Sequence, residues 1–413
     1  MDQKPKLTEK QYYVVFAFVT SLFMLWGIAI TMGDVLNSHF QNVLHVSKAE
    51  SSLVQFSIFG AYAVMGIPAG LFMKKFGYKN GVLFGLSLYA IGAFLFIPAA
   101  NTESFDFFRV ALFILACGLA TLETVAHPFV ASLGNQATSD QRINFAQTFN
   151  GVGAVIGPLL GKFFVFGTLI AATDGALTSV KVLYTAIAIV IAIIAVSFAF
   201  VKVPALTDPH VIATDTYAIA AEGHVEKSLF SNKHFVFAVV AQFFNVAAQA
   251  GTWAYFINYG HDVMGMEHDE ASGYMAVFMV MMIIGRATGT ALMRFIKPYK
   301  LLAIFAFGSI VSCLIVAQAW GWVSFVTLFF VNFFFSIMFP TIFSLGLKDL
   351  GAKTQQASSF IVMGVVGGAV FPYFMGLIAD KNVAHAYYLP IVCYTVIFFF
   401  AYLYPKLNKR VQL

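Results

Sequence analysis

The sequence predicts an all-α membrane protein that crosses the bilayer many times. Of its 413 residues, 60% are hydrophobic and only 10% are charged, whereas soluble proteins carry about 25% charged residues. Apolar runs of about 20 residues, the length that spans a bilayer, recur along the whole chain. Nearly all of the chain is therefore used in crossings, and no large soluble domain is expected.

Twelve membrane-spanning helices are predicted, because apolar runs alternate with short polar segments. Their approximate ranges are 12–38, 51–73, 81–99, 106–133, 144–167, 181–202, 234–259, 270–294, 300–319, 322–347, 357–379 and 386–405. The longest polar segment, 203–233, follows the sixth run. It serves as a linker that divides the chain into two six-helix halves, 1–202 and 234–413.

The first run predicts a transmembrane helix and not a removable signal peptide. It follows a short basic segment, contains Asp34 and offers no small-residue cleavage site. Orientation follows from the Lys and Arg residues, of which nineteen fall on the side of the N-terminus and five on the other. The positive-inside rule then places both termini and the linker in the cytoplasm.

The two halves share sequence motifs. "PFVASLG" (128–134) ends the fourth run and "PTIFSLG" (340–346) ends the tenth, and "GVGAVIGPLLG" in the fifth run resembles "GVVGGAVFPYFMG" in the eleventh. Two matches in the same order indicate duplicated halves. Such parallel repeats are typical of one class of secondary transporter, with a substrate site between the halves near the midplane. The glycines of the fifth run predict close packing between helices.

Two acidic residues, Asp34 and Glu123, lie inside predicted spans. A charged side chain at a helix centre costs roughly 2.5–3.5 kcal/mol on insertion scales, so such a residue usually marks a pathway or a proton relay. Desolvation disfavours the charged form of a carboxyl group. Both residues could therefore bind and release protons near neutral pH. The alternative is a structural acid that a neighbouring hydroxyl or amide group holds.

His127 lies four residues after Glu123 and therefore faces the same way on a helix. It could tune Glu123 or contact a substrate. The alternative is a core histidine whose hydrogen bonds are satisfied within the protein.

Amide side chains recur on single faces of the fifth and seventh spans. They offer both donors and acceptors, which suits a polyhydroxylated ligand, and a tryptophan could stack on the apolar face of a sugar ring. The alternative is hydrogen bonding between helices, worth ~0.6 kcal/mol per contact. The residues that we expect to line a polar cavity are Trp26, Gln147, Asn150, Gln242, Asn245, Gln249 and Trp253.

Other classes of function lack support in the sequence. The three cysteines, Cys117, Cys313 and Cys393, lie within apolar runs without a C-x-x-C motif and are expected to be free thiols. We find no metal-ligand cluster, nucleophile motif or cofactor fingerprint, so no enzyme, cofactor or metal site is expected. The basic residues are scattered through short loops, which does not indicate a nucleic-acid partner. We expect a monomer whose partner is the lipid bilayer.

Several motifs resemble one known family over roughly 12–405. These are "PAGLFMKKFGYKNG", "LETVAHPFV", "NFAQTFNGVGAVIG", "AQAGTWAYF", "GRATGT", "FPTIFSLGLKDLG" and "SSFIVMGVVGGAVFPYFMGLIAD". They resemble the major facilitator superfamily and, within it, the fucose–galactose–hexose proton symporters. The general superfamily motif has an aspartate where this chain has Lys74, a departure that is typical of the fucose-transporting group.

The resemblance implies a symporter of the bacterial inner membrane that imports a proton with L-fucose or a related hexose or deoxyhexose by alternating access. It implies that Asp34 carries the proton and that Glu123 couples protonation to sugar binding. It also implies that Gln147 and Asn150 contact the sugar.

Two departures from the family pattern lie beside the implied cavity. Gly33 and Thr31 stand where the family and a fucose-transporting member have asparagines, and His127 replaces the asparagine of "ETAANPF". We therefore include Thr31 and His127 among the candidate substrate contacts. The alternatives that remain are a sodium-coupled hexose symporter, a drug–proton antiporter and a membrane receptor that does not transport.

Overall fold

The structure, a computed structural model, describes residues 7–134, 139–166, 176–203, 229–293, 295–348, 350 and 354–408. Within these ranges, twelve helices are long and apolar enough to cross a membrane, and no strand is present. The predicted all-α fold with twelve crossings is therefore confirmed.

The first six crossings contain seven α-helices and two short helical segments. α3 holds both the second and the third crossing. The chain reverses between them at Gly77, whose φ of +80° is a conformation that favours glycine. The elements are, in order, a 3-10 turn (Lys10–Tyr12), α1 (Tyr13–Val43), α2 (Lys48–Ser51), α3 (Leu53–Phe94), α4 (Phe96–Asn101), α5 (Phe105–Ser132), α6 (Ser139–Leu160), a π-helical turn (Gly161–Val165) and α8 (Ala176–Phe200).

The last six crossings are more often interrupted than the sequence predicts. The expected continuous span 234–259 breaks at Tyr255, and the expected span 357–379 contains a 3-10 turn (Gly364–Val366). The helices are α10 (Lys233–Ala254), α11 (Phe256–Met264), α12 (His268–Leu292), α13 (Pro298–Val316), α14 (Trp322–Phe335), α15 (Met338–Leu347), α16 (Thr354–Met363), α17 (Gly367–Ala379) and α18 (Tyr388–Leu407).

Glycine lets helix backbones touch in both groups of helices. A Cβ atom on Gly153 of α6 would clash with the Met24 carbonyl oxygen of α1, and one on Gly367 would clash with the Phe243 carbonyl oxygen of α10. The predicted packing role of the glycines in "GVGAVIGPLLG" is thus confirmed. Small residues allow this close approach where lipid supplies no hydrophobic driving force between helices.

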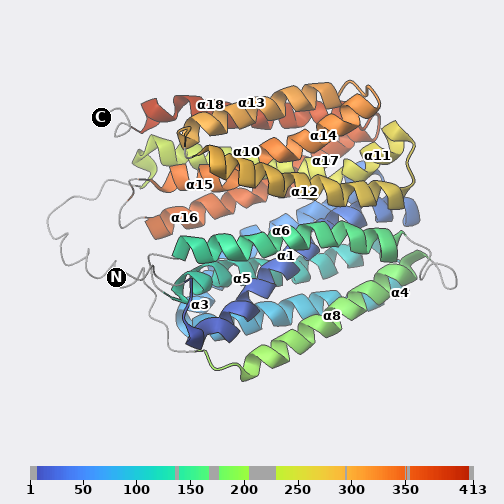
Figure 1. Ribbon diagram of the computed structural model, residues 1–413. Coiled ribbons are helices and arrows are strands. Elements are labelled where there is room, and N and C mark those ends of the chain that lie inside the picture. The colour runs from blue at the N-terminus through green and yellow to red at the C-terminus, as the bar shows by residue number, and fades with distance from the viewer. Residues whose placement is uncertain are drawn as a thin grey trace.

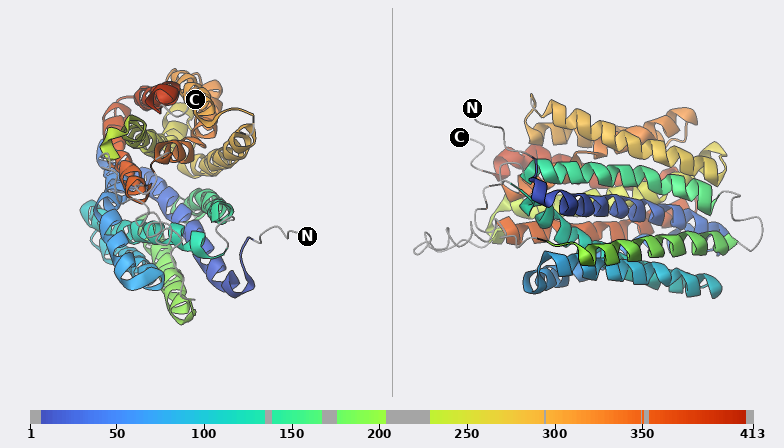
Figure 2. Two further views of the ribbon diagram at one scale, coloured as in Figure 1. Left: turned by 90° about the vertical axis from the view of Figure 1, so that its left-hand side faces the viewer. Right: turned by 60° about the horizontal axis from the view of Figure 1, so that its bottom comes forward.

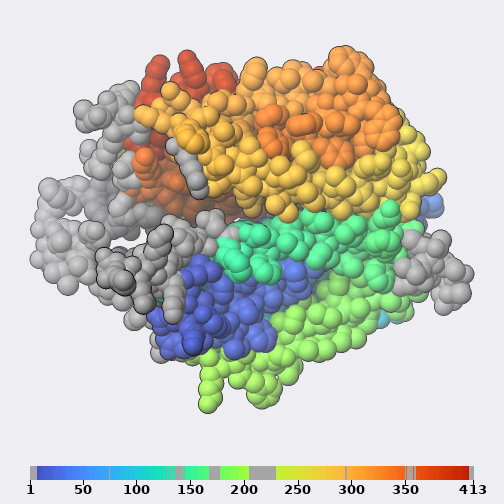
Figure 3. Space-filling model, in the orientation of Figure 1, coloured from blue at the N-terminus to red at the C-terminus, as the bar shows by residue number. Residues whose placement is uncertain are grey.

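The helices form two groups that lie side by side. In Figure 1 the blue-to-green helices α1 to α8 occupy the lower group and the yellow-to-red helices α10 to α18 the upper group, and the end-on view of Figure 2 separates them clearly. In Figure 3 the groups meet along a seam between α6 and α12. The boundaries 1–202, 203–233 and 234–413 stay a prediction, and residues 204–228 lie outside the described ranges.

We call the end of the bundle at which α1 begins and α18 ends the proximal end, and the opposite end the distal end. Hydrogen bonds and an ion pair that join the two groups cluster at the distal end. The Lys48 ammonium group pairs with Asp262 at 2.8 Å, and the backbone N–H groups of Lys48 and Ala49 donate to the Asp380 carboxylate at 2.6 and 3.3 Å. We call these residues the distal latch.

Further polar contacts surround the distal latch. Asn258 donates to Gln41 at 2.6 Å, Asn37 donates to the Ala254 carbonyl oxygen at 2.8 Å, and Ser272 donates to the Pro158 carbonyl oxygen at 2.8 Å. The Tyr255 hydroxyl group donates to the Lys48 carbonyl oxygen at 2.8 Å. The distal end is therefore closed in this conformation.

Asp262 of the distal latch stays ionised over the physiological pH range. Partial burial opposes the ionisation of Asp262, but hydrogen bonds and charge from His261 and Lys48 outweigh it and hold the pKa of this carboxyl below its ordinary value. A carboxyl of lowered pKa contributes stability at neutral pH, and this contribution is lost only as the pH falls through the lowered value. The ion pair should persist until the pH is below the ordinary aspartate pKa of about 4.

Removing the Asp380 carboxylate, which accepts the two backbone hydrogen bonds of the distal latch, should open the distal end. We expect Asp380→Ala to raise the ratio of open to closed molecules roughly fivefold, since an exposed charged contact is worth up to about 1 kcal/mol. Thr102 and Ala319 are exposed in distal turns of the two groups. Spin labels on cysteines introduced at these two positions would show the opening in double electron–electron resonance as a longer distance between the labels.

The matched control is Asp106→Ala, because Asp106 is an exposed distal acid that pairs within its own group with Arg109 at 2.8 Å. It should leave the distances unchanged. An unchanged distribution in Asp380→Ala would show that the latch does not hold the distal end.

Candidate functional site

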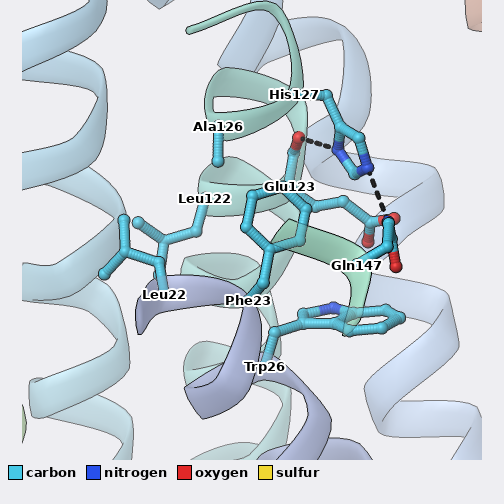
Figure 4. Close-up of a pocket in the computed structure, with 8 residues that line it drawn as sticks. All are labelled: Leu22, Phe23, Trp26, Leu122, Glu123, Ala126, His127 and Gln147. Carbon is cyan, nitrogen blue, oxygen red and sulfur yellow. Dashed lines mark hydrogen bonds between the residues drawn. The ribbon is translucent and has the colours of Figure 1, made fainter. Parts of the chain in front are cut away.

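A small pocket lies between α1, α5 and α6 in the first group of helices. Figure 4 shows the eight residues that line it, which are Leu22, Phe23, Trp26, Leu122, Glu123, Ala126, His127 and Gln147. Its free volume of about 10 Å³ is near the minimum that admits one water molecule. Four of the predicted site residues, Trp26, Glu123, His127 and Gln147, are thus brought together in a tightly closed arrangement.

His127 connects two helices across this pocket. Its ring Nδ1 lies 2.9 Å from the backbone carbonyl oxygen of Glu123, and its Nε2 lies 2.9 Å from the amide nitrogen of Gln147 on α6 (Figure 4). The edge of Phe23 meets the ring at a centroid distance of 4.9 Å and an interplanar angle of 78°. The ring is therefore fixed on three sides.

A tyrosine of α3 links two other site residues. The indole N–H of Trp26 donates to the Tyr62 hydroxyl group, and that hydroxyl group also interacts with the Glu123 carboxyl group. Tyr62 is buried. A hydroxyl group donates one proton and accepts others, so Tyr62 can accept from Trp26 while it donates to the carboxyl group.

Asp34 lies away from the pocket, toward the distal end of α1. It is eight residues beyond Trp26, which corresponds to about 12 Å along the helix, and it is only 4% exposed. Its Oδ1 accepts a hydrogen bond of 3.0 Å from the Gln55 amide. Its Oδ2 and the Gln55 oxygen are both buried without a partner. Asp34 and Gln55 thus present two unpaired acceptor atoms.

Thr31 and Asn150 lie in the contact between α1 and α6 and do not line the pocket. The Thr31 hydroxyl group donates to the Gly27 carbonyl oxygen of its own helix at 3.0 Å, and a Cβ atom on Gly157 of α6 would clash with it. The Asn150 amide donates to the Phe23 carbonyl oxygen at 3.2 Å. Both residues therefore hold the two helices that carry Trp26 and Gln147.

The predicted amide stripe of α10 lies largely inside the second group of helices. Gln242 and Asn245 are fully buried, and all four of their amide atoms lack a hydrogen-bond partner. Trp253 donates to Asn332 at 3.1 Å, and Asn332 donates in turn to the Phe278 carbonyl oxygen at 2.7 Å. Gln249 is only partly buried. The structure therefore does not bring these residues into the pocket of Figure 4.

Two residues of this site, Gln55 and Tyr62, were not expected from the sequence. They are seven positions apart in α3 and therefore share a helix face. That spacing of polar residues within an apolar run is the signal that could have identified them. Within the described residues, no group of three or more His, Cys, Asp and Glu side chains could hold a metal ion, and the three cysteines are buried and free.

Comparisons with known proteins agree with the fold. The model of the Major Facilitator Superfamily matches residues 14–372. The chain is 37% identical to the L-fucose-proton symporter of Escherichia coli over 95% of this chain and 93% of that protein. It is 34% identical to a glucose/galactose transporter of Brucella abortus over 95% of this chain and 94% of that protein.

Solved structures give the same result. A transporter of this superfamily, FucP, crystallised in the outward conformation, is 36% identical, with a TM-score of 0.68 over 96% of this chain and 99% of that chain. A D-xylose-proton symporter shares the fold at 15% identity, with a TM-score of 0.73 over 96% of this chain and 97% of that chain.

The unpaired amide of Gln242 should reduce stability in this conformation. A buried polar group without a partner costs about 1–3 kcal/mol, so we expect Gln242→Leu, which keeps the volume, to raise the melting temperature by several degrees. Asn332→Leu is the matched contrast, since it leaves the Trp253 N–H group unpaired and should lower the melting temperature. A thiol-reactive dye in detergent measures both, because Cys117, Cys313 and Cys393 become reactive only on unfolding. Equal destabilisation by both variants would contradict the assignment of Gln242 as unpaired.

Proposed function

The chain belongs to the Major Facilitator Superfamily, and we propose that it imports a monosaccharide together with a proton by alternating access. We infer that the cargo is L-fucose or a related hexose or deoxyhexose. The names of the relatives that match nearly the whole chain, L-fucose-proton symporter and glucose/galactose transporter, support this inference. The same names support a transporter and not an enzyme.

The observation that carries the proposal is the meeting of Glu123 with Trp26, His127 and Gln147 in one pocket. Trp26 offers an aromatic face, Gln147 an amide and Glu123 a carboxyl group, which are kinds of group that bind a sugar ring and its hydroxyl groups. The pocket admits only about one water molecule in this conformation, so we infer that it widens before sugar binds. Because the carboxyl group is part of the same pocket, its protonation state changes what a bound sugar meets. This arrangement supports Glu123 as the residue that couples the proton to the sugar.

We assign Asp34 as the proton carrier because of its pairing with Gln55. The two unpaired atoms of this pair, Asp34 Oδ2 and Gln55 Oε1, are both acceptors. A proton on Asp34 supplies the donor that the pair lacks, and the acid and the amide can then satisfy each other. The closed surroundings of Asp34 therefore match the protonated carboxyl group better than the ionised one.

The exposure of the two acids supports a cycle of alternating access. The distal end is closed by the latch, Asp34 is buried, and Glu123, His127 and Gln147 are partly exposed. The positive-inside rule supports a cytoplasmic proximal end, so we assign this conformation as one that faces inward. In keeping with this assignment, the TM-score to FucP in the outward conformation is only 0.68 although the sequences are 36% identical.

Coupling follows from the cost of burying charge. Closing the two halves over an ionised carboxyl group costs several kcal/mol unless the charge is compensated, whereas a protonated group removes most of that cost. The fully loaded protein can therefore rock between the two conformations. For the return of the protein after both cargoes have left, we infer that other groups of the protein compensate the ionised carboxyl groups. The half-loaded protein closes poorly, and this links sugar movement to proton movement. We take the transporting unit to be a monomer.

Glu123→Gln should abolish uphill transport while it preserves exchange. We expect weakly buffered, de-energised cells that express the natural sequence to show an alkaline shift after addition of L-fucose. Glu123→Gln cells should show none, because the amide cannot exchange a proton. Vesicles of this variant preloaded with sugar should still exchange it for labelled sugar, since that process needs no net proton movement.

The control is Asp106→Asn, an exposed acid outside the site, which should behave as the natural protein. Sugar accumulation by Glu123→Gln in response to a pH gradient would refute the role of Glu123. Uptake by the natural protein that follows an imposed sodium gradient at equal pH would instead decide for the sodium-coupled alternative. If L-fucose gives no shift, D-galactose and D-glucose are added next.

A further inference from the structure

The hydrogen bonds of His127 define which end of the Gln147 amide faces the pocket. A backbone carbonyl oxygen can only accept, so His127 Nδ1, at 2.9 Å from the Glu123 carbonyl oxygen, must carry a proton. On its other side, the atom at 2.9 Å from His127 Nε2 is the amide nitrogen of Gln147, which can only donate. His127 Nε2 must therefore be the acceptor, and the ring is neutral with its proton on Nδ1.

A neutral His127 ring with its proton on Nδ1 leaves no freedom for the Gln147 amide to turn over. Exchanging its nitrogen and oxygen would place an oxygen, which can only accept, against a ring nitrogen that also accepts, with no proton between them. A ring with its single proton on Nε2 would leave the Glu123 carbonyl oxygen without a donor, so only an imidazolium ring, with a proton on each nitrogen, could face an exchanged amide. Phe23, whose ring edge lies against the imidazole, restrains rotation of the ring.

Resting on the proposed function, we propose that His127 is a positioning residue for sugar specificity: it directs the Gln147 oxygen toward the sugar as an acceptor. The pocket then requires a hydroxyl group that donates at the position facing Gln147. In Figure 4 the Gln147 oxygen points away from His127 and toward the side of the pocket at which Trp26 lies. An asparagine at position 127, which offers a shorter side chain with both a donor and an acceptor, would not fix the amide in this way.

Monodeoxy and monofluoro derivatives of the transported sugar test the direction of this hydrogen bond. Fluorine can accept but cannot donate, and hydrogen can do neither. At the position that faces Gln147, both derivatives should bind the natural protein about tenfold more weakly than the parent sugar. In Gln147→Leu the parent and both derivatives should bind equally at that position, which identifies it. Binding is measured by displacement of labelled sugar from purified protein, so proton coupling is not required.

The variant His127→Leu tests the positioning role. Once the ring is gone, the Gln147 amide can rotate and donate, so the fluoro derivative should recover affinity relative to the deoxy derivative. A merely structural loss would weaken all three sugars alike. His385→Leu, a change at an exposed distal histidine, is the matched control and should preserve the pattern of the natural protein.

Two results of the binding measurements would overturn the proposal. One is a fluoro derivative that binds the natural protein as well as the parent sugar at the Gln147 position. The other is an unchanged pattern in His127→Leu.

Nuclear magnetic resonance of ¹⁵N-histidine provides a measurement that needs no sugar. The signal that disappears in His127→Leu should show a protonated Nδ1 and an unprotonated Nε2. A proton on Nε2, alone or together with one on Nδ1, would overturn the proposal even if the cargo were not a sugar. If no sugar bound while this protonation state were found, the proposed function would fail and the arrangement of His127 and Gln147 would stand.

Discussion

Inside the bilayer, polar side chains find hydrogen-bond partners in the protein and not in the lipid, and the structure of the first group of helices depends on this constraint. Trp26, Tyr62 and Glu123 form one connected set, and the Glu123 backbone, His127 and Gln147 form another. Both sets meet at Glu123. Their geometry requires α1, α3, α5 and α6 to be close, which the glycine contacts between α1 and α6 permit. The same close packing of the helices is thus what allows the polar atoms to pair.

In the second group of helices, only some of the buried amide side chains have hydrogen-bond partners. Asn332 has partners for both ends of its amide, whereas Gln242 and Asn245 have none. Unpaired buried amides are rare because each costs free energy. In the proposed cycle, the conformation that opens the distal end or the arrival of a hydroxyl-rich ligand supplies the missing partners. The difference between the two groups therefore fits a protein whose first half holds the proton sites and whose second half changes its polar contacts during the cycle.

Helical periodicity and composition were sufficient to predict the twelve-helix fold and the shared face of Glu123 and His127. Periodicity alone did not distinguish a contact of His127 with the Glu123 side chain from one with its backbone. The structure shows the backbone contact, since side chains on a helix lean toward its N-terminus and reach the carbonyl group one turn earlier. Periodicity also groups Gln242, Asn245 and Gln249 on one face without identifying the neighbour of that face. The contacts of Gln55 with Asp34 and of Tyr62 with Trp26 and Glu123 become known only once α3 is packed against α1 and α5.

The magnitudes of the two kinds of electrostatic contact decide which one controls the conformation. The distal latch consists of one partly exposed ion pair and two hydrogen bonds, each worth at most about 1 kcal/mol in contact with water. An ionised carboxyl group enclosed among helices costs several kcal/mol. A few weak latch contacts can therefore hold the distal end closed only while the enclosed acids are neutral or compensated. In the proposed cycle, the change at the acids exceeds the strength of the latch, so protonation of Asp34 and Glu123 would decide whether the distal end is open or closed without a direct contact to the latch.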